Sequence, residues 1–208
     1  MTDPDGDCRL CLAIENEPDA HLTRSLARRN LDAKVVRVID DRFPLSSFHV
    51  LVATTRHTLS VGGSSATTRQ VIAERIDDLF RVLDARGESY VAFEHGPDQI
   101  RAGGGCIDHT HVHVVATPSP VTAPMVLEAR TVIDAGLTVW KVFDSTEAVV
   151  SSVWGHYVWI RPASGAFLVA RPAARLPSQF WRRWYGEQFG PAWDWRALDV
   201  RNQLGPAS

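Results

Sequence analysis

The chain has 208 residues, of which 45% are hydrophobic and 22% are charged, and its formal net charge is −2. This length and composition fit one globular domain, or a domain with a large extension, and they argue against a disordered chain. The small net charge provides no broad basic field, so we do not expect binding to nucleic acid by phosphate neutralisation. The sequence lacks both a run of about 18 apolar residues and a secretory signal, which predicts a cytoplasmic protein without a membrane partner.

The first half of the sequence alternates between strand and helix signals. Two segments rich in β-branched residues, 34–41 and 48–55, predict strands joined by a Pro-containing turn. After a Gly/Ser/Thr linker, apolar residues at helical spacing predict a long helix over 69–87. Residues 89–96 predict a third strand. A glycine-rich loop then leads to a fourth strand over 109–117.

The composition changes after residue 120. Six of the seven tryptophans lie beyond residue 150, and we interpret most of them as packing residues because large aromatic side chains dominate core burial. The patterns predict helices over 125–136 and 177–190 and strands over 137–143, 156–162 and 166–172. We therefore divide the chain into a domain over residues 1–120 and an α/β extension over 121–208 that packs on it.

The most informative stretch is GGGCIDHTHVHVVATP, in which His109, His111 and His113 occupy every second position. Side chains at this spacing share one face of a strand, so we predict that the three imidazoles point the same way and the valines point to the other side. Burying three histidines without a role is costly, which favours a functional cluster. The residues alone leave two chemistries open, a catalytic metal site and nucleophilic catalysis by an imidazole.

Two of the three cysteines, Cys8 and Cys11, form a C-x2-C pair. An odd number of cysteines in a chain without an export signal argues against a disulfide scaffold. The pair can bind one tetrahedral metal, act as a redox pair, or have no role. The residues that follow do not supply the βαβ context of a redox pair, and a zinc site requires two more ligands elsewhere in the chain.

The histidine stretch HTHVHVV resembles the H-φ-H-φ-H-φ-φ signature of the histidine triad (HIT) superfamily of nucleotidyl hydrolases and transferases, with Thr110 a departure at the first φ. The segments FHVLVATTRH and FEHG extend the resemblance over residues 8–118. The C-terminal part resembles the extension of bacterial HIT-like proteins with an E-H-G strand. The resemblance implies an α+β fold with an antiparallel sheet of about five strands and one long helix, followed by an α/β extension.

The resemblance also implies a reaction and the residues that carry it. The middle histidine, His111, is expected to attack the α-phosphorus of a nucleotide and form a covalent nucleotidyl-histidine. His113 is expected to stabilise the phosphoryl oxygens and to protonate or orient the leaving group. Cys106 and Glu94 complete the expected catalytic set, and the expected substrate-binding residues are His49, His95, Gly104 and Gly105. For His49, a hydrogen-bonded strand residue is an equal alternative.

Glu94 departs from the pattern of the family. Many members carry Asn-Glu-Gly at this strand end, where the amide faces the phosphates, whereas this chain has FEHG. A carboxylate that faces a phosphate is repelled unless a cation or a hydroxyl intervenes. We therefore expect Glu94 to hold an amine or hydroxyl of the leaving group or acceptor, or to be a structural residue paired with an arginine.

Zinc-bearing members of the family use a C-x2-C pair, a histidine after the second strand and the first triad histidine. The resemblance therefore implies a closed, structural zinc site formed by Cys8, Cys11, His57 and His109. The expected partners are a nucleotide or nucleotidyl conjugate as substrate and a second copy of the chain in a homodimer. Two alternatives stay open: a nucleotide-binding module without turnover, and a metal-dependent hydrolase that uses the histidines as ligands.

Overall fold

The computed structural model describes residues 8–16, 34–100, 107–163 and 165–190, apart from the side chain of Trp140. The predicted site residues Cys106, Gly104 and Gly105 lie outside the described residues.

The elements in chain order are α1 (Arg9–Asn16), β1 (Val36–Asp40), β2 (His49–Thr54), the 3-10 helix η3 (Val61–Gly63), α2 (Ala66–Ala85), β3 (Tyr90–Gly96), β4 (His111–Ala116), α3 (Ala123–Leu127), α4 (Arg130–Asp134), β5 (Val139–Phe143), α5 (Thr146–Ser152), β6 (Tyr157–Pro162), β7 (Phe167–Ala170) and α6 (Phe180–Phe189).

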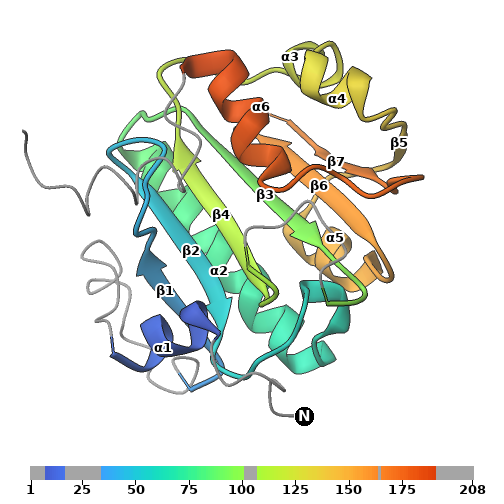
Figure 1. Ribbon diagram of the computed structural model, residues 1–208. Helices are drawn as coiled ribbons and strands as arrows, with labels where there is room; N and C mark the ends of the chain where they lie inside the picture. The colour runs from blue at the N-terminus through green and yellow to red at the C-terminus, as the bar shows by residue number, and fades with distance from the viewer. Residues whose placement is uncertain (1–7, 17–33, 101–106, 164, 191–208) are drawn as a thin grey trace, which may run out of the picture.

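The described strands form one antiparallel sheet of seven strands in the order β1-β2-β4-β3-β6-β7-β5 (Figure 1). The α+β class, the antiparallel sheet and the single long helix are as the sequence predicts. The sheet has more than the expected five strands because the three strands beyond residue 120 extend it. They join through β6, which pairs with β3 from Val91 to Gly96. The division of the chain at residue 120 stays a prediction.

The long helix α2 and the shorter α5 cover one face of the sheet. Ser65 caps α2 by accepting a hydrogen bond from the backbone N–H of Thr68. The apolar residues of α2 face the sheet at helical spacing, and they pack with alternate residues of β1, β2, β3 and β4, including Val112 and Val114. Burying this apolar surface removes it from water and stabilises the sheet on this side.

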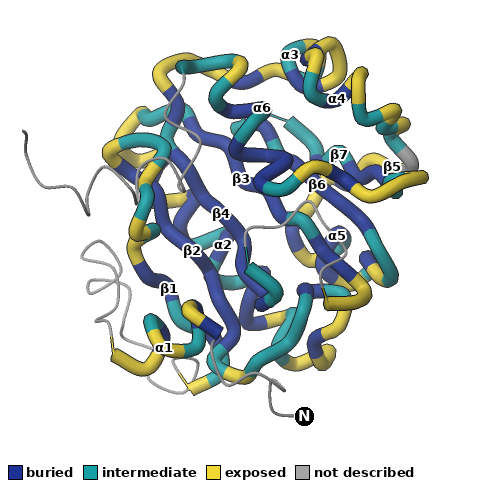
Figure 2. The backbone as a smooth tube through the Cα atoms, in the orientation of Figure 1, coloured by how far each residue is buried: buried dark blue, intermediate teal, exposed yellow. Residues whose placement is uncertain are grey.

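The opposite face is covered from two ends. At one end, α1 packs with residues of β1 and β2 in a small cluster that includes Leu51 and Ala53. At the other end, α3, α4 and α6 pack on β3, β4, β6 and β7, with Trp181 and Trp184 of α6 in the cluster. Figures 1 and 2 show α6 in front of the upper part of the sheet, α1 at its lower left, and the central strands buried along their length. The interpretation of the α6 tryptophans as packing residues agrees with their burial. Among the described helices, none combines the length and apolarity needed to span a bilayer.

Several elements differ from the sequence prediction. The helices α1 and α5 are short and were not predicted, and the predicted helix over 125–136 is divided into α3 and α4 because Ala129 has extended backbone angles. The strand β4 begins at His111 rather than at residue 109. The residues before it leave the ladder because the backbone N–H of Thr110 donates to the carbonyl of Thr58 in the loop after β2.

Gly96 at the end of β3 provides a test of the packing between β3 and β6. A Cβ at this position would overlap the ring of Tyr157, which is fully buried and hydrogen-bonded through its hydroxyl. We expect Gly96→Ala to lower the free energy of unfolding by about 1–3 kcal/mol because the ring cannot move away without losing its partners. Denaturant unfolding measures the change. Gly165→Ala is the control, since its Cβ would make ordinary contact with Pro162, and an equal loss in both variants would contradict the prediction.

Candidate active site

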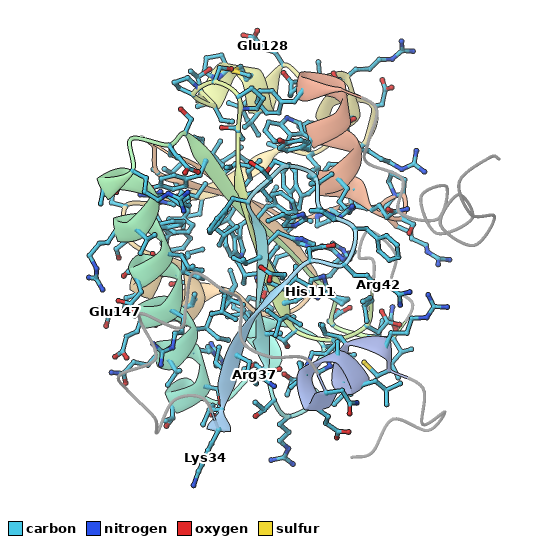
Figure 3. All side chains as sticks on the ribbon, turned by 90° about the vertical axis from the view of Figure 1, so that its left-hand side faces the viewer. Lys34, Arg37, Arg42, His111, Glu128 and Glu147 are labelled. Carbon is cyan, nitrogen blue, oxygen red and sulfur yellow. The ribbon has the colours of Figure 1, made fainter. Side chains whose placement is uncertain are left out.

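Strand pairing places His111 and His113 on the same face of the sheet. His113 is opposite Leu51 and His111 is opposite Ala53 in the register of β2 and β4, so the two imidazoles share the face that carries α1 and α6. Their ring centroids are 4.9 Å apart. In Figure 3, where His111 is labelled, α2 lies to the left of the sheet and α1 and α6 lie to the right. The alternation predicted from the sequence therefore holds for these two histidines.

His111 is held in one tautomer by the backbone before the strand. Its Nδ1 lies 2.6 Å from the carbonyl oxygen of His109, and because a carbonyl can only accept, Nδ1 carries the proton and donates it. In the neutral ring the lone pair then lies on Nε2. Within the described residues, the bond from Nδ1 is the only hydrogen bond of this ring, and Nε2 makes none. The ring thus presents an unprotonated nitrogen that can attack an electrophile.

His113 is held in the complementary tautomer by His49. The backbone N–H of Leu45 donates to His49 Nδ1 at 3.0 Å, so a neutral His49 carries its proton on Nε2. This Nε2–H donates to His113 Nδ1 at 2.8 Å, which leaves the proton of a neutral His113 on its own Nε2. The site therefore combines an acceptor nitrogen on His111 with a donor N–H on His113. A stacked ring of Phe93, 4.8 Å from His113 between centroids, keeps its orientation.

A buried carboxylate and a buried arginine complete the cluster. Asp41 Oδ2 lies 3.4 Å from His49 Nε2 and 3.7 Å from His113 Nδ1. Arg182 Nη1 lies 3.3 Å from the same carboxylate oxygen. The sequence analysis missed both residues. The acidic doublet that ends the first predicted strand was a signal for Asp41, whereas the site of Arg182 depends on how α6 packs.

The environment keeps the imidazoles neutral. Burial is the main cause that holds the pKa of His49 and of His113 well below the ordinary value, and the charge of Arg182 lowers both further. Burial also lowers the pKa of His111, although the hydrogen bond to the backbone and the charge of Asp41 oppose this effect. Burial raises the pKa of Asp41, and the adjacent guanidinium acts against that rise. A neutral ring at His111 is the form that can act as a nucleophile.

The structure does not bring Glu94 together with His111. Glu94 follows Phe93, which is opposite His113, so its side chain points to the other face of the sheet, toward α2. There its carboxylate accepts hydrogen bonds from the backbone N–H of Val61 at 2.8 Å, from the hydroxyl of Tyr157 at 2.9 Å and from the indole N–H of Trp159 at 2.8 Å. This placement favours the structural alternative for Glu94, with neutral donors in place of the expected arginine.

His95, the neighbour of Glu94 in β3, points to the histidine face. Its Nε2 lies 2.9 Å from Nε2 of His156, and its Nδ1 is buried without a partner among the described residues. Burial lowers the pKa of His95 to about 3, and the nearby His156 and His111 add to this effect. His156 is not among the residues that the sequence analysis predicts for the site, because its contact with His95 depends on the pairing of β3 with β6.

A second group of ligand atoms lies at the other end of β4. Cys8 Sγ is 3.5 Å from His109 Nδ1, and Cys11 Sγ is 3.4 Å from Nδ1 of both His109 and His57. The four ligand atoms all lie within 4.8 Å of one another, close enough to bind one metal ion. The other ring nitrogen of His109, Nε2, donates to the carbonyl of Thr54 at 2.8 Å, which turns Nδ1 toward the sulfurs. The ring of His109 thus faces the cysteines and not the rings of His111 and His113.

Comparisons with known proteins were made by sequence and by structure. No protein-family profile and no curated protein matches the sequence. Among solved structures, a HIT family hydrolase from Clostridium thermocellum is similar at 20% identity and a TM-score of 0.37, over 53% of this chain and 90% of that one. A histidine triad protein from Clostridium difficile is similar at 16% identity and a TM-score of 0.37, over 59% and 98%. Yeast Ap4A phosphorylase is similar at 13% identity and a TM-score of 0.46, over 79% and 64%. At these values, any activity has to be argued from the site itself.

The buried carboxyl of Glu94 generates a prediction about stability and pH. Burial raises its pKa from 4.5 to about 7, against the effect of its hydrogen-bond donors. Because the folded pKa is the higher one, the contribution of Glu94 to stability is complete below pH 4.5 and is lost as the pH rises to about 7. The loss amounts to roughly 3 kcal/mol for this shift.

Glu94→Gln removes the titration and leaves the shape of the side chain. The stability of the native protein minus that of Glu94→Gln should therefore decrease between pH 4.5 and pH 7. Urea unfolding at four or five pH values measures this difference. Glu88→Gln, at a less buried acidic position, is measured at the same pH values as the control. A flat difference for Glu94→Gln would show that this carboxyl does not titrate in that range.

Proposed function

We propose that the protein is a nucleotidyl hydrolase or transferase that acts through a covalent nucleotidyl-histidine on His111. The observation that carries this proposal is the hydrogen bond from His111 Nδ1 to the carbonyl of His109, which leaves a lone pair on Nε2 next to the donor N–H of His113. The sequence motif around these residues, which resembles that of the HIT superfamily, supports the same reaction.

In the first step, Nε2 of His111 forms a bond to the α-phosphorus while the bond from phosphorus to the leaving group breaks. His113 donates its Nε2–H to a phosphoryl oxygen, and the leaving group takes any proton that it needs from solvent. In the second step, water or an acceptor hydroxyl attacks the same phosphorus and gives its proton to solvent, and the bond to His111 breaks. The ring of His113 stays neutral in both steps, because Nδ1 of His49 accepts the backbone N–H of Leu45 and His49 has no second proton to pass on.

The Nε2–H of His113 also argues for a phosphoryl substrate. A neutral imidazole N–H adds a hydrogen bond to a phosphoryl oxygen without a fixed charge on the protein, and burial makes such a bond stronger than it is in water. His95 offers another buried nitrogen on the same face, in line with its expected role in substrate binding. Glu94 has no part in this mechanism because its carboxylate lies across the sheet.

Both alternatives from the sequence are less well supported. A nucleotide-binding module without turnover has no need for the two opposite tautomers of His111 and His113. A metal-dependent hydrolase would need imidazoles that converge on an ion, but His109 faces the cysteines, and His49 and His113 are hydrogen-bonded to each other. Activity that is unchanged by prolonged treatment with a chelator is expected from the covalent mechanism.

The nucleophile is tested with a panel of nucleotides that includes nucleoside phosphoramidates and dinucleoside polyphosphates. We expect His111→Asn to lower turnover by at least about 10³-fold while the substrate still binds, because the covalent route is lost. Acid-sensitive labelling of the native protein with a radiolabelled nucleotide should detect the intermediate, and the variant should not become labelled. His21→Asn, at a histidine outside the motif, is the control. Turnover of His111→Asn within tenfold of the native rate would exclude this mechanism.

We further propose that Cys8, Cys11, His57 and His109 bind a zinc ion. Two cysteines and two histidines are a common ligand set for structural zinc. A sulfur and an imidazole nitrogen on one tetrahedral zinc are about 3.6 Å apart, given ordinary zinc–ligand bond lengths. The observed separations of 3.4 and 3.5 Å fit this edge. When bound, such a metal supplies a cross-link between α1 and the residues before β4, and it takes no part in the reaction.

The zinc site is tested by elemental analysis of the purified protein, which should contain close to one zinc per chain. We expect Cys8→Ser to lose the metal and to lower the free energy of unfolding by roughly 3 kcal/mol, the contribution of a ligand at about 100 times its Kd. Cys106→Ser, which changes the third cysteine of the sequence, should keep the metal. Native protein that is free of metal, or that melts at the same temperature after chelation, would return the cysteine pair to the alternative without a role.

A further inference from the structure

The C-terminal helix α6 brings a buried arginine to the histidine cluster. Arg182 is 2% exposed, and its guanidinium lies 3.3 Å from the carboxylate of Asp41 and donates a second hydrogen bond to the carbonyl of Phe43. A buried charge is costly unless it is paired and hydrogen-bonded, and these contacts supply both. The arginine therefore belongs to the cluster around His49 and His113 rather than to the surface of the helix.

The packing of α6 determines where this guanidinium lies. The residue before it, Trp181, is buried, and its indole N–H donates to the backbone carbonyl of Glu94 at 3.0 Å. The ring of Trp181 also lies 6.3 Å from the ring of Phe93, which stacks on His113. Because α6 is fixed on β3 by these contacts, Arg182 has little freedom to move relative to Asp41.

Asp41 connects the arginine to the imidazoles. One carboxylate oxygen accepts the backbone N–H of Phe43 at 2.7 Å. The other lies near Arg182, near Nε2 of His49 and near Nδ1 of His113. An ionised Asp41 can only accept, so it favours the proton on Nε2 of His49. That is the same proton that His49 directs at His113.

We propose that Arg182 is a positioning residue: its ion pair with Asp41 keeps the carboxylate ionised and thereby holds His49 and His113 in the tautomers that leave the Nε2–H of His113 available to the substrate. This inference rests on the proposed function, in which that N–H is used. It also gives the C-terminal segment a role in the active site, which the sequence resemblance does not assign to it.

The effect of removing the guanidinium follows from the partners of Asp41. The charged or titratable groups facing this carboxylate are Arg182 from α6, His49 from β2, and His111 and His113 from β4. Without Arg182, burial would favour the neutral acid, which can donate a proton to Nε2 of His49. Nδ1 of His49 would then carry the proton and meet the backbone N–H of Leu45, so two donors would face each other. The His49–His113 hydrogen bond would be lost.

A metal ion at Asp41, His49 and His113 is the competing interpretation, because their ligand atoms lie within 4.8 Å of one another. Two observations favour the arginine. The two imidazole nitrogens are 2.8 Å apart, which is a hydrogen-bond distance and shorter than the edge of about 3.3 Å between two nitrogens on a tetrahedral zinc. The guanidinium already supplies a positive charge at the carboxylate, and an added cation would be repelled by it.

Kinetics of Arg182→Met and Arg182→Lys test the proposal in the otherwise native chain. We expect Arg182→Met to lower kcat by about 10²-fold with KM changed by less than about threefold, because substrate contacts stay while the donor is misplaced. Arg182→Lys keeps the positive charge but lacks the planar guanidinium group. Its kcat should therefore be about tenfold higher than that of Arg182→Met. Adding Asp41→Asn to Arg182→Met should cost little more, because the two residues act as one unit. Arg175→Met, at an exposed arginine, is the control.

Nitrogen-15 NMR of the histidine side chains gives a second result that needs no substrate. In the native protein, His113 should be protonated on Nε2 and His49 on Nε2, and Arg182→Met should change both assignments. Unchanged tautomers, or a variant that only melts earlier while keeping its kcat, would overturn the proposal. A second equivalent of bound metal that is lost in Asp41→Asn would overturn it in favour of a metal site. If the tautomers change as expected but no nucleotide is turned over by the native protein, the proposed function fails and the positioning by Arg182 stands.

Discussion

The candidate site depends on the position of β4 between β2 and β3. The register with β2 sets which residues of β4 face α2 and which face α1 and α6, so Val112 and Val114 enter the core while His111 and His113 point away from it. A shift of one residue would exchange the two sets and bury both imidazoles under α2. The apolar core on one side of the strand therefore fixes the geometry of the catalytic candidates on the other side.

Hydrogen bonds to backbone groups then select the tautomers. The carbonyl of His109 and the N–H of Leu45 are fixed in space by the chain, and each can play only one role, acceptor or donor. They leave a lone pair on His111 and a proton on His113 without any fixed charge on the two rings. His109 lies just before β4 and contributes to both clusters. Its backbone carbonyl accepts the hydrogen bond from His111, and its ring lies against Cys8 and Cys11.

The residues beyond position 120 are part of this arrangement. The strand β6 pairs with β3 and supplies Tyr157 and Trp159 as donors to Glu94, which removes that carboxylate from the histidine face. On the opposite face, α6 supplies Trp181 and Arg182. Together these contacts place Glu94 and His95 on opposite faces of the sheet. The carboxylate is held by neutral donors on the face toward α2, and the other face carries the imidazoles.

The sequence by itself determined the main strands, the long helix and the shared face of His111 and His113, because the periodicity of apolar residues and the alternation along a strand are local properties. The spacing of Cys8 and Cys11, together with the family resemblance, also led to the group with His57 and His109. Only the tertiary structure decided that Glu94 faces α2, that Asp41 and Arg182 join the histidines, and that the strands of the extension enlarge the same sheet. These features are contacts between segments far apart in the chain. Which segments meet depends on strand order and helix packing, and no local pattern encodes either one.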